Sequence, residues 1–506
     1  MDRALWRPVP AGWTDPLLAV LLGAIYTALL LGTVGDLGYA RDEGFYFDAA
    51  RSYQRWFELL GRSWRLAVER ADAVWSVNHE HPAFVKSLFA LSHLTLFDRH
   101  RVFAMEGTSY RFPAMALSGL AVAVVYLWGS RARGRMAGAV GAVSLAAMPR
   151  FFFHAHLACF DAPVVAMWTL CAYAYWRSMQ RGGYLWPLGV GIAFGLALNT
   201  KHNSWFLPVV CGLHALLLQL PGVAREVAGR AARRRALAAL GAMATIGPLL
   251  FYATWPWIWR DTVARLAAYA RFHLHHVYYN MEFLGQNYFE PPMPRAYAFV
   301  MTAATVPAIT LLLFAIGLGV QAPALARWWA AVRRQHERAA RAPSVDEPAG
   351  PATALFWLLA LGVQYGAWLS PSTPIFGGTK HWMTAYPFMA LLAGAGFCAV
   401  LRRVLALLPE RWTRGAGGPA AQLACAACVL VGPAVQAGHA HPWGLSAYTP
   451  LVGGAAGGAT LGLNRGFWGY TTGMVAGYLN RAARRGAPVY PQPAVRRPAL
   501  GAALAA

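Results

Sequence analysis

The feature that most constrains this sequence is a series of long apolar runs, which recur from near the N-terminus to about residue 438. A helix that crosses the hydrocarbon core of a bilayer needs about 20 predominantly apolar residues. Of the 506 residues, 57% are hydrophobic and only 13% are charged, and a soluble protein of this length could not bury so much apolar surface. The sequence therefore predicts an all-α polytopic membrane protein.

The apolar runs predict eleven membrane spans, at residues 16–35, 113–130, 136–150, 161–177, 184–200, 205–221, 236–254, 297–319, 352–370, 383–401 and 420–438. With the N-terminus in the cytoplasm, every inside loop contains arginine: 131–135, 177–183, 225–235, 326–341 and 401–414. Positive charge in short loops marks the cytoplasmic side of a membrane protein. We therefore assign the net charge of +23 to membrane orientation and expect no nucleic-acid partner.

This topology leaves two long loops on the outer face, at about 36–112 and 255–296, followed by an outer tail at 439–506. We therefore divide the chain into a transmembrane domain at 1–438 and a C-terminal outer tail. The first apolar run lacks the short core and small-residue cleavage site of a signal peptide. It is predicted to be a retained first span, which places the C-terminus outside.

The first outer loop begins with "RDEGFYFDAARSY", at residues 41–53. Phe45, Ala49 and Tyr53 recur at helical spacing, while Asp48 and Arg51 fall on the other side. This pattern predicts an amphipathic helix that lies in the headgroup layer. A second interfacial helix is predicted at 82–97, where a proline stands in the first turn.

Ionisable residues gather on the predicted outer side. All but two of the 15 histidines lie there, the exceptions being His214 and His336. Such groups at the ends of spans indicate a functional site. The acidic and basic members of this set are Asp42, Glu43, Glu80, Asp161, Glu282, Lys86, Lys201 and Lys380.

Taken singly, these residues also have ordinary structural explanations. Asp42 and Asp161 could cap helices, and Lys201 could extend from a span end toward water. The His-x-His pairs suggest zinc, but side chains at i and i+2 point apart on a helix. Cys425 and Cys428 lie in an alanine-rich span, where small-residue packing explains them better than metal or redox chemistry. The shared placement on one side favours a site.

Several segments, in this order, resemble motifs of the membrane glycosyltransferases of the C-type fold, in particular glycosyltransferase family 39. "RDEGFYFDAARSY" resembles the Asp-Glu pair that opens their first outer loop, and "NHEHPAFVKSLFA" resembles a His-Pro-Pro-x-x-Lys stretch, with Ala83 in place of the second proline. Further similar segments are "YRFPAMALSGLAVAVVYLWG", "MPRFFFHAHLACFDAPVVAMW", "LALNTKHNSWFLP", "GGTKHWMTAYPFMALLAG" and "HPWGLSAYTPLVGGAAGGATLGLNRGFWGY".

The resemblance implies a donor sugar linked through phosphate to a polyprenol, and transfer at the outer face of a bacterial inner membrane with inversion in a single displacement. The family's protein O-mannosyltransferases and lipid A aminoarabinose transferases carry outer domains that this chain lacks or shortens, so protein, lipid and glycan acceptors all stay open. The donor is a substrate, and no cofactor is expected; a divalent metal is disfavoured.

The resemblance and the chemistry together assign roles to named residues. The incoming hydroxyl must lose a proton, which a carboxylate can accept, and fixed cations stabilise the charge that develops on the departing phosphate. Asp42 is the expected base, with Glu43 beside it and Asp161 as a second carboxylate. Mutual repulsion of the adjacent carboxylates is expected to raise a pKa. The expected phosphate contacts are Lys86, Lys201, Lys380, His381 and Arg111, and the residues expected to position substrate are His79 and His81.

A transporter or flippase of lipid-linked or small polar solutes is the alternative function. Such proteins carry ionisable residues near the middle of the membrane and broken helices in matched halves. The charged groups here lie at outer ends, and the sequence shows no internal duplication. "YYNMEFLGQNYFEPP", at 278–292, and the "GGAAGG" segment, at 453–458, could shape the acceptor side.

Overall fold

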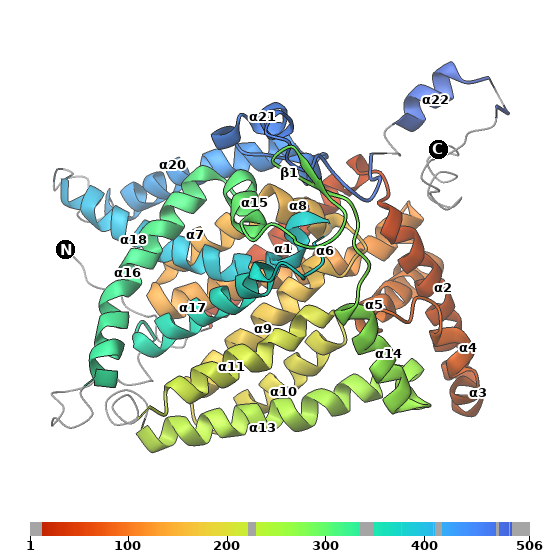
Figure 1. Cartoon of the computed structure of the whole chain (residues 1–506), viewed down its shortest axis with the longest axis horizontal. Helices are drawn as coiled ribbons and strands as arrows, with labels where there is room; N and C mark the ends of the chain where they lie inside the picture. The colour runs from red at the N-terminus through yellow and green to blue at the C-terminus, as the bar shows by residue number, and fades with distance from the viewer. Residues whose placement is uncertain are drawn as a thin grey trace.

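The computed structural model is dominated by helices, as the sequence predicts (Figure 1). It describes residues 13–220, 229–333, 348–375, 377–407, 409, 417–471, 475–484 and 486–487. Parts of the arginine-rich loops at 225–235, 326–341 and 401–414, the end of the tail and His336 lie outside these residues. The all-α class and the helical membrane architecture are confirmed.

Most of the helices form a bundle. Seven described helices are long and apolar enough to cross a membrane: α1 (Thr14–Thr33), α6 (Glu106–Arg133), α13 (Gly229–Ala253), α16 (Ala308–Arg333), α17 (Pro351–Gly366), α18 (Tyr386–Leu407) and α20 (Gly417–Ala440). The bent pair α7 (Arg135–Ala146) and α8 (Pro149–His156) makes eight if it forms one span. The remaining predicted spans correspond to α9 (Asp161–Gln180), α10 (Leu185–Leu198) and α11 (Phe206–Leu217), which are more polar or shorter. The count of eleven spans stays a prediction.

Two of the predicted spans are interrupted, each at a proline. The axes of α7 and α8 differ by 67°, and the extended residue Met148 precedes Pro149 at the break. Likewise, Val306 is extended before Pro307, which separates α15 (Tyr297–Thr305) from α16. A proline ring disfavours helical backbone at the residue before it. Continuous spans at 136–150 and 297–319 are therefore replaced by broken ones.

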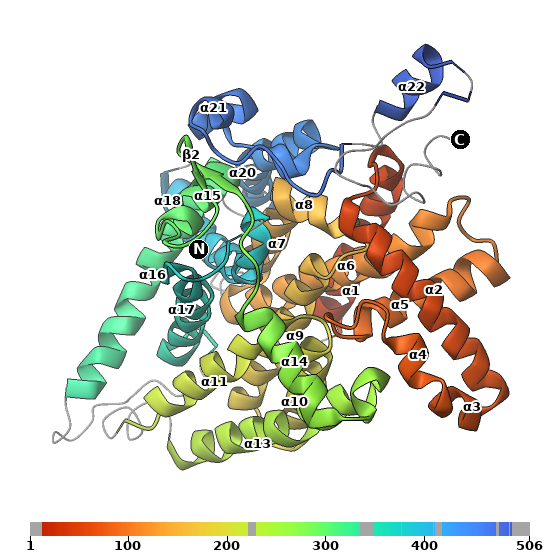
Figure 2. The same cartoon turned by 45° about the vertical axis from the view of Figure 1, so that its right-hand side comes forward.

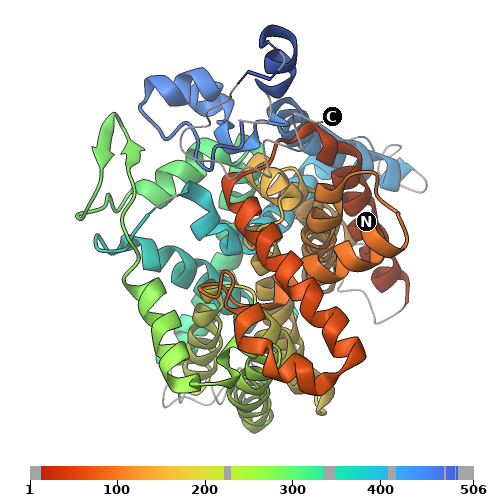
Figure 3. The ribbon, with the colours of Figure 1, turned by 90° about the vertical axis from the view of Figure 1, so that its right-hand side faces the viewer.

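Short helices cover one end of the bundle. Figure 3 looks toward this end, with α2 (Arg41–Arg62) in front of several bundle helices seen end-on. It is followed by α3 (Trp64–Glu69), α4 (Ala71–Trp75) and α5 (Phe84–Ser92), which continues as a π-helical turn at His93–Arg99. The two predicted interfacial helices are confirmed as helices. Ala49, Tyr53 and Trp56 of α2 are buried, whereas Arg55 is exposed.

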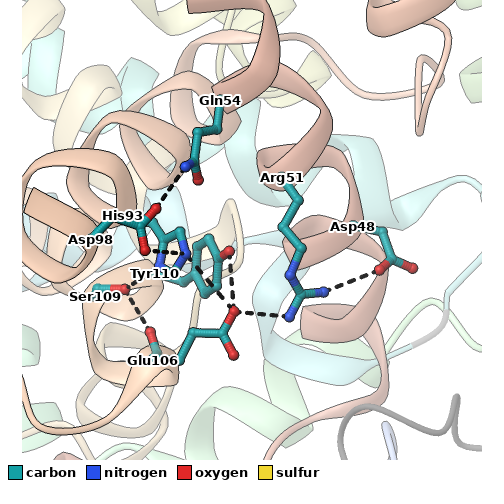
Figure 4. A network of polar contacts seen from close by, with 8 residues as sticks. All are labelled: Asp48, Arg51, Gln54, His93, Asp98, Glu106, Ser109 and Tyr110. Atoms are coloured by element: carbon teal, nitrogen blue, oxygen red, sulfur yellow. Dashed lines mark hydrogen bonds and ion pairs between the residues drawn. The ribbon is translucent and has the colours of Figure 1, made fainter. Parts of the chain in front are cut away.

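A network of polar side chains ties α2 to the start of α6 (Figure 4). Arg51 contacts Asp48 at 3.3 Å and Glu106 at 3.0 Å. The Nδ1 atom of His93 hydrogen-bonds to Ser109 Oγ at 2.9 Å. The first outer loop is therefore held against the bundle by ion pairs and hydrogen bonds as well as by apolar packing.

The second outer loop contains α14 (Thr262–Leu274) and a hairpin of β1 (Met281–Phe283) and β2 (Gln286–Tyr288). The strands are antiparallel, with Met281 opposite Tyr288. Gly285, in the turn, donates a backbone hydrogen bond to the carbonyl of Gly462 at 3.1 Å. The second loop and the C-terminal tail are therefore in direct contact.

The tail folds back over the covered end of the bundle. It contains 3-10 turns at Gly444–Ser446 and Pro450–Val452 and the helices α21 (Gly454–Thr460) and α22 (Ala476–Ala482). In Figure 2 the segment after α21 passes near α8 toward the start of α2. Leu445 and Tyr470 are buried in the same apolar core as Tyr53 and Phe160. The tail is thus part of the folded layer that covers this end of the bundle.

Candidate active site

A cavity of about 420 Å³ lies where the outer loops, the tail and the ends of the bundle helices meet. It is enclosed by the first turn of α2, the start of α9, the 201–202 connection between α10 and α11, α14 and the residues after it, the 377–381 loop and the tail. Its lining residues are Arg41, Asp42, Tyr46, His81, Phe160, Asp161, Lys201, His202, His273, His276, Tyr279, Asn280, Glu282, Gly377, Lys380, His381, Asn464, Gly466, Phe467 and Trp468.

Asp42 stands in the first turn of α2 and faces this cavity. It is not the residue that caps the helix, because Glu43 accepts the hydrogen bond from the backbone N–H of Ala40 at 2.8 Å. Burial raises the pKa of Asp42, against the opposing charges of Lys380 and Arg41. The expected rise is present, but its main cause is loss of water and not repulsion by Glu43. A carboxylate with a raised pKa is a better proton acceptor.

Asp161 is the first residue of α9, and its carboxylate faces two basic groups. The Lys201 ammonium lies 2.5 Å from Asp161 Oδ1, and His154 Nδ1 lies 3.6 Å from Oδ2. Lys201 is buried, so it does not extend to open water as a snorkelling lysine would. Lys201 and Asp161 form a buried ion pair in the cavity wall.

Lys380 comes from a short 3-10 turn, Gly378–His381, before α18. Its ammonium lies 4.3 Å from the ring centre of Trp468 and 5.4 Å from that of Phe467. Burial lowers its pKa, while Asp161 and Asp42 act in the opposite direction. Gly377 is left-handed, with φ of 72°, and a Cβ there would lie 2.5 Å from Lys380 Cε. The glycine makes room for the lysine.

Histidines form much of the cavity wall. Burial lowers the pKa of His81 and of His202, and it lowers the pKa of His273 to about 4. These rings are therefore neutral near pH 7, and the positive charge of the cavity comes from lysine and arginine. His381 also lines the cavity, with its ring 4.8 Å from that of Trp368. Across the described part of the chain, no group of three or more His, Cys, Asp or Glu is arranged to hold a metal ion.

Four of the ten residues to which the sequence analysis gave a role, and also Glu80, are absent from the cavity lining. Glu43 and Arg111 form a fully buried ion pair instead, with 2.7 Å from Arg111 Nε to Glu43 Oε1 and from Nη2 to Oε2. Glu43 also accepts a hydrogen bond from the backbone N–H of Ala158 at 3.0 Å. This pair joins α2, α6 and the segment before α9, so its evident role is to hold the backbone on either side of Asp42 in position.

The other two are Lys86 and His79. The Lys86 ammonium donates to the carbonyls of Asn78 at 2.5 Å and of His81 at 2.9 Å, and burial lowers its pKa to about 7. It holds the loop that presents His81. His79 is exposed at the surface of that loop, and its ring stacks on Trp257 with centres 4.5 Å apart.

The sequence interpretation missed part of the wall. Arg41 and Phe160 stand next to Asp42 and Asp161 in the sequence, and Tyr46 lies about one helical turn after Asp42. Trp468 and Asn464, by contrast, lie more than 400 residues after Asp42, and only folding brings them close. The run "NRGFWGY", in which glycines flank an aromatic pair, was the available signal.

Gly453 and Gly454 of "GGAAGG" line a second, mainly apolar hollow of about 1160 Å³ between α20 and the tail.

The model of a family described as dolichyl-phosphate-mannose-protein mannosyltransferase matches residues 99–252. No curated protein sequence matches the chain.

Solved structures resemble the chain over nearly its whole length. ArnT from Cupriavidus metallidurans bound to undecaprenyl phosphate is 17% identical, with a TM-score of 0.51, and the match covers 98% of this chain and 85% of that one. The oligosaccharyltransferase AglB from Archaeoglobus fulgidus, in complex with an inhibitory peptide and a dolichol-phosphate, is 11% identical, with a TM-score of 0.51 and coverage of 94% and 60%. At these identities the structures show the fold. Together with the family match over residues 99–252, they support the resemblance: the chain has the C-type fold of membrane glycosyltransferases and is similar to the mannosyltransferase family over that segment.

Proposed function

We propose that this protein transfers a sugar from a polyprenyl-phosphate donor to an acceptor hydroxyl at the outer face of the membrane, with inversion at the anomeric carbon. The observation that carries the proposal is the meeting of Asp42, Asp161, Lys201 and Lys380 around one cavity at the covered end of the bundle. The polyprenol tail stays in lipid, so the reacting bond must lie near the membrane surface. A cavity at the end of the spans is at that depth.

In this reaction, Asp42 accepts the proton of the acceptor hydroxyl. The hydroxyl oxygen forms a bond to the anomeric carbon as the bond from that carbon to the phosphate oxygen breaks. The electron pair of the broken bond leaves with the lipid phosphate. The products are the glycosylated acceptor and polyprenyl phosphate, and the proton rests on Asp42 until water removes it.

Lys380 is the principal cation for the departing phosphate in this proposal. Lys201 contacts Asp161 at 2.5 Å, and Arg41 stands at the exposed rim. Developing negative charge is stabilised most strongly where water is excluded and the donors are fixed. The buried Lys380 ammonium, backed by two aromatic rings, meets both conditions. His381 and His81 lie where they can hold the sugar or phosphate.

The similar proteins support the donor class. ArnT binds undecaprenyl phosphate in one solved structure, and AglB binds a dolichol-phosphate in another. The arginine-rich loops, which the positive-inside tendency assigns to the cytoplasm, support an outer position for the cavity end. A carrier for lipid-linked solutes is the competing function, and it would move its solute without forming a new glycosidic bond.

The direct test is transfer of a radiolabelled sugar from polyprenyl phosphate in membranes that contain the purified protein. Because removal of a catalytic base commonly costs about 10²–10⁴ in rate, Asp42→Asn is expected to lose activity by that factor while it still inserts and folds. Glu290→Gln is the matched control, since Glu290 is an exposed outer carboxylate outside the cavity lining. Full activity of Asp42→Asn would contradict the base assignment. Movement of the lipid-linked sugar with no product would favour the carrier.

A further inference from the structure

Trp468 adopts a backbone conformation that is unusual for its residue type. Its φ is +70°, in the left-handed region, where a Cβ is crowded and a bulky side chain is rare. Such residues persist only when the surrounding structure holds them there, and they cluster at functional sites. The carbonyl of Trp468 accepts a hydrogen bond of 2.7 Å from the backbone N–H of Arg41. The tail is therefore attached at the first turn of α2, next to Asp42.

The side chain of Trp468 reaches the proposed base. Both side chains line the same cavity. Hydrogen bonding from Trp468 lowers the pKa of the Asp42 carboxyl, as a smaller influence than Lys380 and Arg41, and the indole N–H can act only as the donor. A hydrogen bond to the ionised carboxylate favours that form and fixes the orientation of its oxygens. Trp468 thereby acts against burial, which favours the protonated acid.

The face of the same ring lies against the proposed phosphate cation. Lys380 Nζ is 4.3 Å from the ring centre, within the distance at which an aromatic ring attracts an ammonium group. The ring also makes T-shaped contacts with His154, with ring centres 5.4 Å apart, and with Phe467, at 4.8 Å. The indole is thus held on several sides while it contacts both charged groups.

We propose that Trp468 is a positioning residue, whose indole sets the separation and orientation of Asp42 and Lys380 across the cavity. The inference rests on the proposed function for the roles of these two groups, but the contacts themselves do not depend on it. A tryptophan satisfies both requirements at once because one side chain offers a donor at its edge and a π-face. The tail therefore contributes to the geometry of the reaction and not only to the closure of the cavity.

Two substitutions separate the two contacts. Trp468→Phe keeps an aromatic face for Lys380 but removes the N–H that bonds Asp42. Its acid limb in the pH profile of kcat/KM is expected to move to higher pH, with the rate on that limb falling about tenfold for each unit by which the pKa of Asp42 rises. The KM for the lipid-phosphate donor is expected to stay near its original value. Trp468→Leu removes both contacts and is expected to raise that KM as well.

Trp443→Phe is the matched control, since Trp443 belongs to the same tail, is 44% exposed and lines the second hollow instead. It should keep the original pH profile. A Trp468→Phe enzyme with an unshifted acid limb would overturn the inference. So would an equal loss of rate at every pH together with a lower unfolding temperature, because that pattern describes damage to the fold.

A second readout needs no sugar transfer. Infrared titration of the purified protein follows the Asp42 carboxyl band, which is identified by its absence in Asp42→Asn. Trp468→Phe is expected to shift the midpoint of that band upward, and an unchanged midpoint overturns the positioning role. If the parent protein transfers no sugar but the midpoint moves, the proposed function fails while the contact between Trp468 and Asp42 stands.

Discussion

The Lys201 ammonium and the Asp161 carboxylate lie 2.5 Å apart in the wall of the cavity, and both side chains are buried. Their opposite charges largely cancel. Under the proposed function, such a balanced pair can exchange partners when a phosphate or sugar hydroxyl arrives. The pair therefore acts as one unit, although α9 supplies one member and the connection between α10 and α11 supplies the other.

A double-mutant cycle tests this unit. Asp161→Asn and Lys201→Gln should each lower kcat/KM for the donor, because each leaves the other partner without its counter-charge. The double variant should lose less than the sum of the two, with a coupling of about 0.5–3 kcal/mol, as is usual for residues in contact. Additive losses would show that the pair is not coupled. Asp72→Asn is a suitable control, because Asp72 pairs with Arg260 and Arg265 outside the cavity lining and should leave kcat/KM unchanged.

The buried pair of Glu43 and Arg111 is expected to affect stability more than chemistry. Removal of one partner from a buried ion pair commonly costs about 3–5 kcal/mol, because an unpaired charge stays buried. Arg111→Met should therefore lower the free energy of unfolding by about that amount, measured by denaturant or thermal unfolding in detergent.

The pair of Arg51 and Glu106 serves as the comparison. These side chains also make a close contact, at 3.0 Å, but 37% and 43% of their surfaces are exposed, and exposed pairs are typically worth about 0.2–1 kcal/mol. Arg51→Met should therefore cost far less than Arg111→Met. Equal losses would show that the Glu43–Arg111 pair contributes no more than a surface contact.

Gly377 is expected to be essential for the position of Lys380. A Cβ at this residue would lie 2.5 Å from Lys380 Cε and 2.9 Å from its Nζ, and φ of +72° disfavours any other residue. Gly377→Ala should raise the KM for the lipid-phosphate donor and lower kcat, since the ammonium must move. Gly182→Ala is the control, with no atom near its Cβ position. A Gly377→Ala enzyme with unchanged kinetics would mean that Lys380 does not contact the phosphate.

The titration of Asp42 makes a prediction about stability. Burial raises its pKa in the folded protein. Its contribution to stability is therefore fully present below the unfolded value, near pH 3.9, and is lost as the pH rises through the folded value. Asp42→Asn cannot ionise, so its unfolding temperature should match that of the parent protein at low pH and exceed it at pH 7. A lower unfolding temperature of Asp42→Asn than of the parent protein at pH 7 would contradict the raised pKa of Asp42.

Much of the fold could be predicted from the sequence because membrane spans depend on local composition. The apolar runs from residue 16 onward coincide with helices, and the spacing of Phe45, Ala49 and Tyr53 indicated one face of α2, on which Ala49 and Tyr53 are buried and Phe45 is half-buried. Pro149 and Pro307 are present in the sequence, but the bends before them were not predicted. A membrane span can tolerate a proline when neighbouring helices supply hydrogen-bond partners for the backbone groups that it frees.

The site was harder to predict, because adjacent charged residues can point in different directions. Asp42 and Glu43 are neighbours, yet one lines the cavity and the other pairs with Arg111 behind it. Residue type does not separate Lys201 from Lys86 either, since only their surroundings in space show which of them reaches the cavity. The contribution of Trp468 depends on contacts between the two ends of the chain, which no local pattern encodes.

The place of the tail has a consequence for the timing of activity during biosynthesis. Asn464, Phe467 and Trp468 complete the cavity wall, and they leave the ribosome after Asp42 and Lys380. A nascent chain can insert its spans and present Asp42 and Lys380 before these residues exist. The cavity wall stays incomplete until this segment has been made and packed, so under the proposed function a partly translated chain cannot yet transfer a sugar.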